Sequence, residues 1–507
     1  MSFSIRSFIS ALPFLFAVST NAFPTRPRGP RGTGSLAARD VELVESGSDG
    51  IYVDAHIIAG GSSSTSTSTT IISSTTSTTS SSSSTTSSQV TVSFAVIQST
   101  ASATPTASAN STSTSAYSTA TSSAAAMPSV LRGVNIGGWL VLEKWMTSDV
   151  FSDTNATDQW TFDQTDGAEA ALQEHWSTYF TEDDVTTIAS WGINAVRIPI
   201  GYWAYNNTGT PYISGADAYL EKAIEWCRAA GIKVLVDCHG SPGSQNGFDN
   251  SGHAGNVEWQ SGDNMDVSIS VLETMAAKYG SMDYSDVVFG LELTNEPISW
   301  DENDFATTKQ WAQDAYAAVV AKAENPDLNI IMHDGFMGPD NWEAVGSAVN
   351  GDSSLADSRF WIDTHLYQNQ VASDSTLTQE EHIEKACNWS TTELLPASVN
   401  LPVIVGEFSA QTNICANPDG STLAGSVCYI DGCQCSSNVD IEYWNEPLIN
   451  ATRMFLEAEM DTFESHARGY FMWTYKGPGA WGYTNAVKYG LVGDKITDRA
   501  YPGQCDS

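Results

Sequence analysis

From residue 128 onward, short apolar runs alternate with longer amphipathic stretches. Short apolar runs bounded by turn residues are typical of buried strands, and apolar residues at helical spacing are typical of helices. Helices are predicted between several of the strands, for example at 218–230 and 305–323. We predict strands at 132–136, 195–198, 234–237, 287–293, 329–332, 360–363, 403–406 and 469–473.

This repetition of strand and helix predicts the fold. Eight such units in one domain of this size favour an α/β fold of the (β/α)8 TIM-barrel type. The alternative is an open doubly wound sheet, which usually carries a glycine-rich phosphate loop after its first strand. No GxGxxG or GxxxxGK[ST] motif occurs at such a place, so we predict a single barrel domain over 128–507 and expect no nucleotide cofactor.

The first 127 residues follow a different pattern. Residues 1–22 combine one basic residue, an apolar run from Phe8 to Val18 and small residues at the end, which is typical of a secretory signal peptide and shorter than the ~20 apolar residues of a membrane span. Residues 23–61 are a basic leader with Pro and Gly, either a pro-segment or simply disordered. Residues 62–127 are mostly Ser, Thr and Ala, which cannot offset the entropy of ordering, so we predict a disordered linker.

Glycosylation and cysteine patterns agree with secretion. Five Asn-X-Ser/Thr sequons begin at Asn110, Asn155, Asn206, Asn388 and Asn450. Eight cysteines in an oxidising compartment favour disulfides. A zinc site is the alternative for one crowded group, but secretion and the lack of a nearby histidine favour disulfides there too. That group lies in a segment too rich in Gly, Ser and Asn to be core, and consists of Cys415, Cys428, Cys433 and Cys435.

The net charge of -37 and the pI near 4.2 restrict the partners. Such a chain repels nucleic acid and anionic membranes, so we expect neither as a partner, although acidity also serves solubility alone. Neutral sugars and polymers are the more natural ligands, and we expect a monomer.

Unusual polar residues stand at the C-terminal ends of six predicted strands. Active sites of (β/α)8 barrels are built at that face, so these side chains should meet there. Two of them are the carboxylates Glu296 and Glu407. Cleavage of a glycoside uses such a pair, with an acid for the leaving oxygen and a second carboxylate that attacks the anomeric carbon or activates water.

The neighbours suggest a division of roles. Arg197 would lie near Glu407, and a guanidinium favours the ionised form that a nucleophile needs. Glu296 would need a raised pKa to arrive protonated, and Asn295 is placed to bind a sugar 2-hydroxyl. Each residue alone has a structural explanation, but their coincidence at strand ends favours a site. Hydroxyl contacts and an apolar platform for a pyranose are expected from His239, His365, Tyr367 and Trp473.

Taken in order, these motifs resemble glycoside hydrolase family 5, and most closely its fungal exo-β-1,3-glucanases, over about 130–505. The resemblance rests on residues 131–140, 194–199, 237–249, 293–297, 363–368 and 403–408. It implies Glu296 as acid/base, Glu407 as nucleophile, release of glucose from non-reducing ends of β-1,3-glucan, slow glucosyl transfer, and neither metal nor cofactor. It also implies a disulfide between Cys387 and Cys505.

Two departures from the family pattern leave alternatives open. Thr474, Tyr475 and Lys476 follow Trp473 where relatives carry a second tryptophan, so either Trp473 or Tyr475 could form the floor of the glucose subsite. Phe248 matches one of two phenylalanines at the acceptor entrance, but residues 368–370 supply no second aromatic. A β-1,6- or β-1,4-glucanase, a wall transglucosylase and a non-catalytic glucan-binding wall protein therefore remain alternatives.

Overall fold

The computed structural model describes residues 40–45, 51–56, 127–394 and 401–505. The predicted signal peptide, at 1–22, and nearly all of the Ser/Thr-rich segment, at 62–127, lie outside the described residues. Within the predicted leader, β1 (Asp40–Glu45) and β2 (Ile51–His56) form an antiparallel pair that we did not predict. Their Val, Leu, Ile and Tyr residues, separated by Ser and Gly, are the signal for a hairpin.

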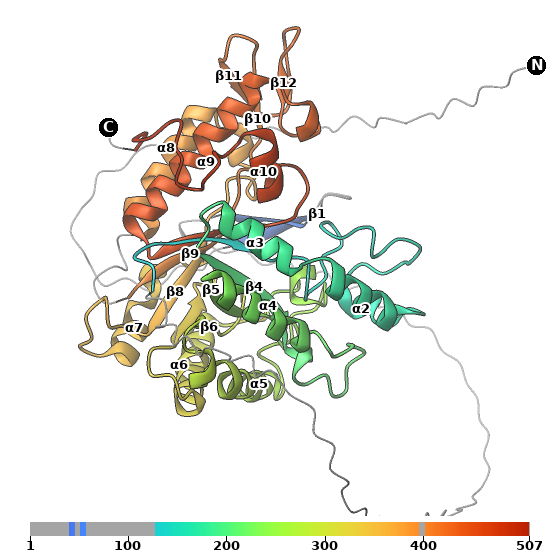
Figure 1. Ribbon diagram of the computed structural model, residues 1–507, viewed down its shortest axis with the longest axis vertical. Coiled ribbons are helices and arrows are strands. Elements are labelled where there is room, and N and C mark those ends of the chain that lie inside the picture. The colour runs from blue at the N-terminus through green and yellow to red at the C-terminus, as the bar shows by residue number, and fades with distance from the viewer. Residues whose placement is uncertain (1–39, 46–50, 57–126, 395–400, 506–507) are drawn as a thin grey trace, which may run out of the picture.

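Eight parallel strands close into a barrel in the order β13-β3-β4-β5-β6-β7-β8-β9, which confirms the predicted fold (Figure 1). Every predicted strand is present. The strands read as continuous apolar runs because the helices cover their outer face and side chains fill the barrel. They are β3 (Leu131–Asn135), β4 (Ala195–Gly201), β5 (Lys233–Gly240), β6 (Val288–Glu292), β7 (Asn329–His333), β8 (Phe360–His365), β9 (Val403–Phe408) and β13 (Gly469–Met472).

Helices surround the barrel, and local signals set their ends. The side chain of Asp304 accepts the backbone N–H of Thr307 at the start of α6, and Gly231 takes a left-handed φ of 74° at the end of α4. The helices are α1 (Gln159–Phe162), α2 (Ala168–Thr178), α3 (Glu182–Ser190), α4 (Asp217–Ala230), α5 (Asn264–Tyr279), α6 (Phe305–Lys322), α7 (Glu343–Asn350), α8 (Gln379–Trp389), α9 (Glu446–His466) and α10 (Tyr483–Tyr489).

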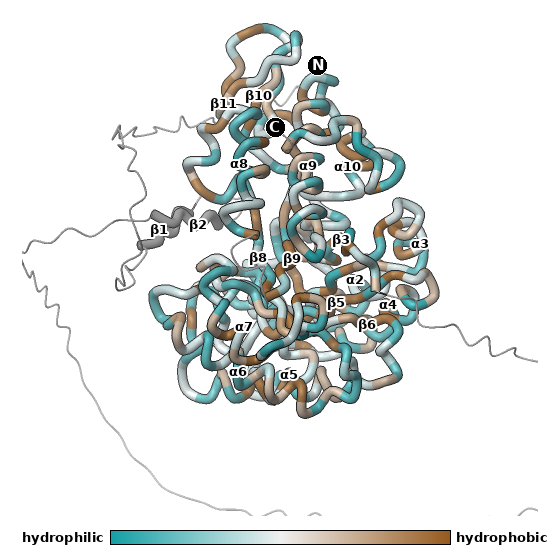
Figure 2. Tube along the Cα trace, turned by 90° about the vertical axis from the view of Figure 1, so that its left-hand side faces the viewer, coloured by the Kyte–Doolittle hydropathy of each residue, from teal (hydrophilic) through white to brown (hydrophobic). Residues whose placement is uncertain are grey.

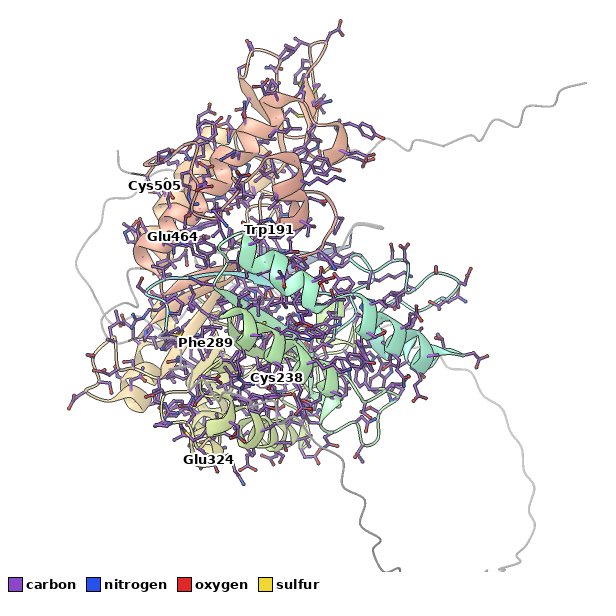
Figure 3. All side chains as sticks on the ribbon, in the orientation of Figure 1. Trp191, Cys238, Phe289, Glu324, Glu464 and Cys505 are labelled. Atoms are coloured by element: carbon purple, nitrogen blue, oxygen red, sulfur yellow. A yellow bond between two sulfur atoms is a disulfide. The ribbon has the colours of Figure 1, made fainter. Side chains whose placement is uncertain are left out.

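A second, smaller apolar cluster fills the inside of the barrel. The rings of Phe289 and Phe471 stack with their centroids 6.4 Å apart, and Phe289 lies within the barrel in Figure 3. Residues at the amino-terminal ends of the strands, including Leu131 and Ala195, complete this apolar cluster. Polar side chains are therefore left to the carboxyl ends of the strands.

Residues 414–445 form a small projecting unit, called here the disulfide lobe, which stands above the barrel in Figures 1 and 2. It contains the sheet β11-β10-β12, made of β10 (Ile414–Ala416), β11 (Thr422–Ala424) and β12 (Gln434–Cys435). Disulfides join Cys415 to Cys435 and Cys428 to Cys433, as expected over zinc. The expectation that this segment lacks core is wrong for Cys415 and Cys435, which are buried within the small sheet.

The disulfide implied by the resemblance is also present. Cys387 at the end of α8 bonds to Cys505, which lies beside α9 in Figure 3. Cys227 and Cys238 are buried free thiols. Among the described residues, no helix has the length and apolar character needed to cross a bilayer.

Candidate active site

Arg197 on β4 is the centre of the polar cluster at the carboxyl ends of the strands. It is fully buried, and its Nη1 donates to Oε1 of Glu407 at 3.0 Å. Its Nε and Nη2 donate to the two oxygens of Glu292 at 2.7 and 3.1 Å, and Nη2 also donates to Oδ1 of Asn295 at 2.7 Å. The guanidinium therefore fixes one catalytic candidate and turns the Nδ2 of Asn295 away from itself.

His365 lies between the two candidate carboxylates. Its Nδ1 is 2.7 Å from Oε1 of Glu296 and 3.4 Å from Oε2 of Glu407. Because both oxygens approach the same nitrogen, they lie within about 6 Å of each other. The two strand-end carboxylates are thus brought together, as the sequence predicts.

Each carboxylate has a further partner of its own. The hydroxyl of Tyr367 donates to Oε2 of Glu407 at 2.8 Å, and Nδ2 of Asn250 donates to Oε2 of Glu296 at 2.7 Å. Glu296 has a left-handed φ of 48°, an unfavourable backbone conformation of the kind that gathers at functional sites. The surrounding contacts hold Glu296 in this conformation.

Of the two candidates for the floor of the glucose subsite, Trp473 belongs to the polar cluster around Arg197 and Tyr475 does not. The buried ring of Trp473 stacks parallel to His239, with centroids 5.6 Å apart, and Nδ1 of His239 lies 2.6 Å from Oδ2 of Asp237. Tyr475 does not reach the cluster, because its hydroxyl donates to Asp184 on α3 at 2.7 Å. Trp473 is therefore the better candidate for the floor of the glucose subsite.

Phe248 is half-buried in the loop that follows β5. This loop also carries Asn250, whose amide holds Glu296, so Phe248 belongs to a segment that borders the acid/base candidate. The structure describes Gln368 and Asn369 as buried, and Gln368 donates to the backbone of His382.

Comparisons with known proteins agree with this geometry. The family model "Cellulase (glycosyl hydrolase family 5)" matches residues 154–432. A glucan 1,3-beta-glucosidase of Candida oleophila is 38% identical over 74% of this chain and 91% of its own length. The chain belongs to glycosyl hydrolase family 5. It is therefore a glycoside hydrolase.

Two further comparisons extend the likeness. A probable glucan 1,3-beta-glucosidase A of Emericella nidulans is 36% identical to this family 5 chain over 76% of the chain and 95% of its own length. The crystal structure of a rutinosidase from Aspergillus niger superposes with a TM-score of 0.56 at 21% identity, covering 71% of this chain and 97% of the rutinosidase. That likeness shows the shared fold.

The charges in this family 5 site differ from those expected. Burial opposes ionisation of Glu296, but the hydrogen bond and charge of His365 outweigh burial and lower the pKa of Glu296. Burial, followed by the charge of Glu296, raises the pKa of Glu407 against His365 and Arg197. The expected order is wrong because the cation nearest to Glu296 is His365, whose distance to each carboxylate the sequence does not give.

The surroundings of His365 favour its protonated form. Burial opposes its charge, but the carboxylates of Glu407, Asp363 and Glu296 raise the pKa of His365 well above its usual value. A proton on Nδ1 of His365 lies one hydrogen bond away from Glu296.

Another buried carboxyl group, Glu143, was not predicted from the sequence. It is buried, Nε1 of Trp145 donates to its Oε2 at 3.0 Å, and its Oε1 has no hydrogen-bond partner in the described part of the chain. Burial and then the charge of Asp249 raise the pKa of Glu143 well above its usual value, and burial raises that of Asp249 to about 6. An acid directly after the apolar run 139–142 was the available signal.

One aromatic residue was also missed. The ring centroid of Trp481 lies 5.4 Å from that of Tyr367 and 5.3 Å from that of Trp145. Trp481 therefore links Tyr367, the partner of Glu407, to Trp145, the partner of Glu143.

One group near the acid/base candidate has metal-ligand spacing. Glu296, His333 and His365 offer ligand atoms within 4.8 Å of one another. However, Nδ1 of His333 accepts the backbone N–H of Gly335 at 3.0 Å, so its Nε2 keeps the proton and offers no lone pair. Nδ1 of His365 is likewise used by Glu296. These residues suit proton transfer better than metal binding.

Proposed function

We propose that this chain is a retaining exo-β-1,3-glucanase that releases glucose from the non-reducing ends of β-1,3-glucan. The observation that carries the proposal is the close approach of Glu296 and Glu407, because one oxygen of each lies 2.7 and 3.4 Å from the same nitrogen of His365. Retaining enzymes place their carboxyl groups ~5–5.5 Å apart, and inverting enzymes ~6.5–9.5 Å apart. The names of the relatives support β-1,3-glucan as the polymer.

In the first step, Glu407 attacks the anomeric carbon while Glu296 gives a proton to the departing glycosidic oxygen, and a covalent glucosyl-enzyme forms. In the second step, Glu296 takes a proton from water, and the resulting hydroxide attacks the same carbon and frees Glu407. Arg197 and Tyr367 orient the attacking carboxylate through one oxygen each. Arg197 donates to Oδ1 of Asn295, so the Nδ2 of Asn295 is the donor for the sugar 2-hydroxyl.

His365 supplies the proton for the first step in this proposal. Its Nδ1–H lies on Oε1 of Glu296, so transfer across that hydrogen bond gives the protonated acid without a solvent path. Loss of the positive charge on His365 accompanies the loss of negative charge on Glu407 as the glucosyl-enzyme forms. The pair Glu296 and His365 therefore works as one acid/base unit.

Glu143 explains the exo action that we propose. Its unpartnered, buried Oε1 is a group that the hydroxyls of a terminal glucose can satisfy. Trp145 donates to the other oxygen of Glu143 and packs against Trp481, so in this proposal a chain that continues past this glucose meets aromatic rings instead of solvent. The terminal residue of the polymer then fits, and an internal residue does not.

The rest of the chain suits this role. We propose that residues 1–22 direct secretion, that 23–61 are a leader, that the Ser/Thr-rich segment 62–127 is a spacer, and that 128–507 act as a monomer on the fungal wall or outside it. Glucosyl transfer to a second sugar follows when an acceptor replaces water in the second step.

The test is the product pattern from a panel of linear glucans. We expect glucose alone from laminari-oligosaccharides, with the non-reducing residue removed first, and slower cleavage of β-1,6- and β-1,4-linked oligosaccharides. A ladder of oligosaccharide products would contradict exo action. Faster cleavage of a β-1,6 or β-1,4 linkage would show that β-1,3-glucan is not the preferred substrate. No cleavage of any of them would favour a glucan-binding protein.

A further inference from the structure

The disulfide lobe carries most of the large apolar side chains that the described residues expose. Four of them, Val427, Tyr429, Ile430 and Tyr443, lie on the lobe, and Tyr429 and Tyr443 are 79% and 65% exposed. Large exposed apolar patches of monomeric proteins often mark binding sites. The concentration of these four residues on one small unit makes the lobe the candidate for a binding surface.

The lobe holds these tyrosines on a fixed frame. Cys428–Cys433 closes the short loop that carries Tyr429, and Nε2 of Gln434 donates to the backbone oxygen of Tyr443 at 2.9 Å. The side chain of Asn445 donates to the oxygen of Gly432 at 3.0 Å, which ties the two segments again. Rigid aromatic groups lose little entropy when they bind a ligand.

A hollow of about 490 Å³ lies beside this frame. Its lining combines hydroxyl, amide and carboxylate groups of Ser437, Asn438 and Glu442 with the half-buried ring of Tyr489. Aromatic faces next to hydrogen-bonding side chains are the chemistry that recognises a pyranose, which has an apolar face and a rim of hydroxyls.

The negative charge of the lobe limits which partners can bind this surface. Residues 414–445 contain Asp419, Asp431, Asp440 and Glu442 but no Lys, Arg or His. With a net charge of -37 for the whole chain, the lobe repels nucleic acid, anionic lipid and a second copy of this chain. A neutral polymer with many hydroxyl donors meets no such repulsion.

The hollow is also close to the active site. Gly479 lines it, and Gly479 belongs to the short segment that carries Trp481, whose ring packs against Tyr367. A polymer held on the lobe would therefore lie next to the site that cleaves its ends.

We propose that the disulfide lobe is a second β-glucan site, separate from the active site, in which Tyr429 and Tyr443 are the aromatic platforms. The inference rests on the proposed function for the identity of the glucan. The site keeps the enzyme on an insoluble polymer between cleavage events, and it takes no part in the chemical steps.

The test compares Tyr429→Ala/Tyr443→Ala with the parent in the full chain. Co-sedimentation with insoluble linear β-1,3-glucan is measured in a Glu407→Ala background, with laminaribiose present to fill the active site. We expect the double variant to bind the polymer about tenfold more weakly, and we expect unchanged kcat/KM on an aryl β-glucoside when Glu407 is intact. Met282→Ala is the matched control, because Met282 is 55% exposed in η3 (Met282–Tyr284), outside the lobe, and should bind as the parent does.

Several outcomes decide the proposal. Equal binding by parent and double variant would overturn it. A parent that sediments as a dimer, with a monomeric double variant, would overturn it in favour of contact between copies. If the parent binds another insoluble β-glucan through these tyrosines but does not cleave β-1,3-glucan, the second site stands and the proposed function fails.

Discussion

Arg197 shows how one residue can organise the site. Its guanidinium has no solvent contact and lies within 3.1 Å of carboxylate oxygens of Glu292, Asp237 and Glu407. A buried cation is tolerated only when it is paired and hydrogen-bonded in this way. Removal of Arg197 would leave several carboxylates without a counter-charge, so the catalytic pair is better tested at the carboxylates themselves.

Loss of either proposed catalytic carboxyl group should lower turnover severely and keep the fold. We expect Glu407→Ala and Glu296→Gln to lower kcat at least ~10³-fold, as measured on an aryl β-glucoside. Azide should rescue Glu407→Ala and give an α-glucosyl azide, because azide enters on the face that the nucleophile has left. A β-azide product, or near-normal turnover with an unchanged circular dichroism spectrum, would refute the assignment.

The pH profile should report the pair of Glu296 and His365. The pKa of His365 is raised well above its usual value, so the wild-type enzyme keeps the shared proton until the pH passes that raised pKa. In His365→Asn the proton depends on the carboxyl group of Glu296 alone, so the alkaline limb of kcat/KM should move to lower pH. An alkaline limb at the wild-type position would exclude His365 as the proton reservoir.

Residue roles could be predicted where type and position together limit the alternatives. Glu407 lies near the carboxyl end of β9 and Glu296 follows β6 in a recognisable barrel, so their meeting followed from the fold. Glu143 lies in an irregular segment after β3, and its link to the site runs through Trp145, which packs against Trp481. The pKa order failed because it depends on the distance from His365 to each carboxylate.

Helix α9 carries two buried glutamates with opposite surroundings. Glu457 accepts from Arg453 and from the backbone N–H groups of Ala500 and Tyr501. Glu459 is equally buried, and neither of its oxygens has a hydrogen-bond partner in the described residues. Burial alone raises the pKa of Glu459 well above its usual value.

This contrast predicts opposite effects of the same substitution. Glu459→Met should stabilise the protein by about 1–3 kcal/mol, because it removes a buried polar group without partners. The gain should be small below about pH 4.3, the pKa of a carboxyl group in the unfolded chain, because Glu459 is then protonated in both states. It should grow as the pH rises, because the carboxyl group ionises freely in the unfolded wild type but not in the folded interior. Glu457→Met should destabilise.

Thermal unfolding of the variants at pH 4 and pH 7 gives the measurement. A gain for Glu459→Met that does not change with pH would show that its carboxyl group is not held neutral by the fold. Stabilisation by Glu457→Met would contradict the contacts described for α9.

The predictability of elements followed their length and periodicity. The barrel strands and helices such as α4 and α6 gave long, clear patterns, and they lie where the sequence predicts. The strands β10, β11 and β12 are too short to show a period, and one disulfide joins β10 to β12. Composition therefore suggested a loop where the chain forms a sheet.

At the scale of the whole molecule, the Cys387–Cys505 disulfide should matter more than the lobe's own disulfides. It spans 118 residues, whereas Cys428–Cys433 spans 5. The chain-entropy model gives ~5 kcal/mol for the longer loop and ~2 kcal/mol for the shorter one. Cys387→Ser/Cys505→Ser should therefore lower the urea midpoint more than Cys428→Ser/Cys433→Ser does. An equal loss would mean that the long disulfide acts by local packing instead.

The central claim is that Glu296 and Glu407 carry out a retaining, end-directed cleavage of β-1,3-glucan. Its most direct test is a time course of laminarin digestion in which proton NMR follows the anomeric form of the released glucose. We predict that β-glucose appears first, as the sole small product, and that α-glucose follows only by mutarotation. Early α-glucose would require inversion and a different catalytic pair, and would contradict the account.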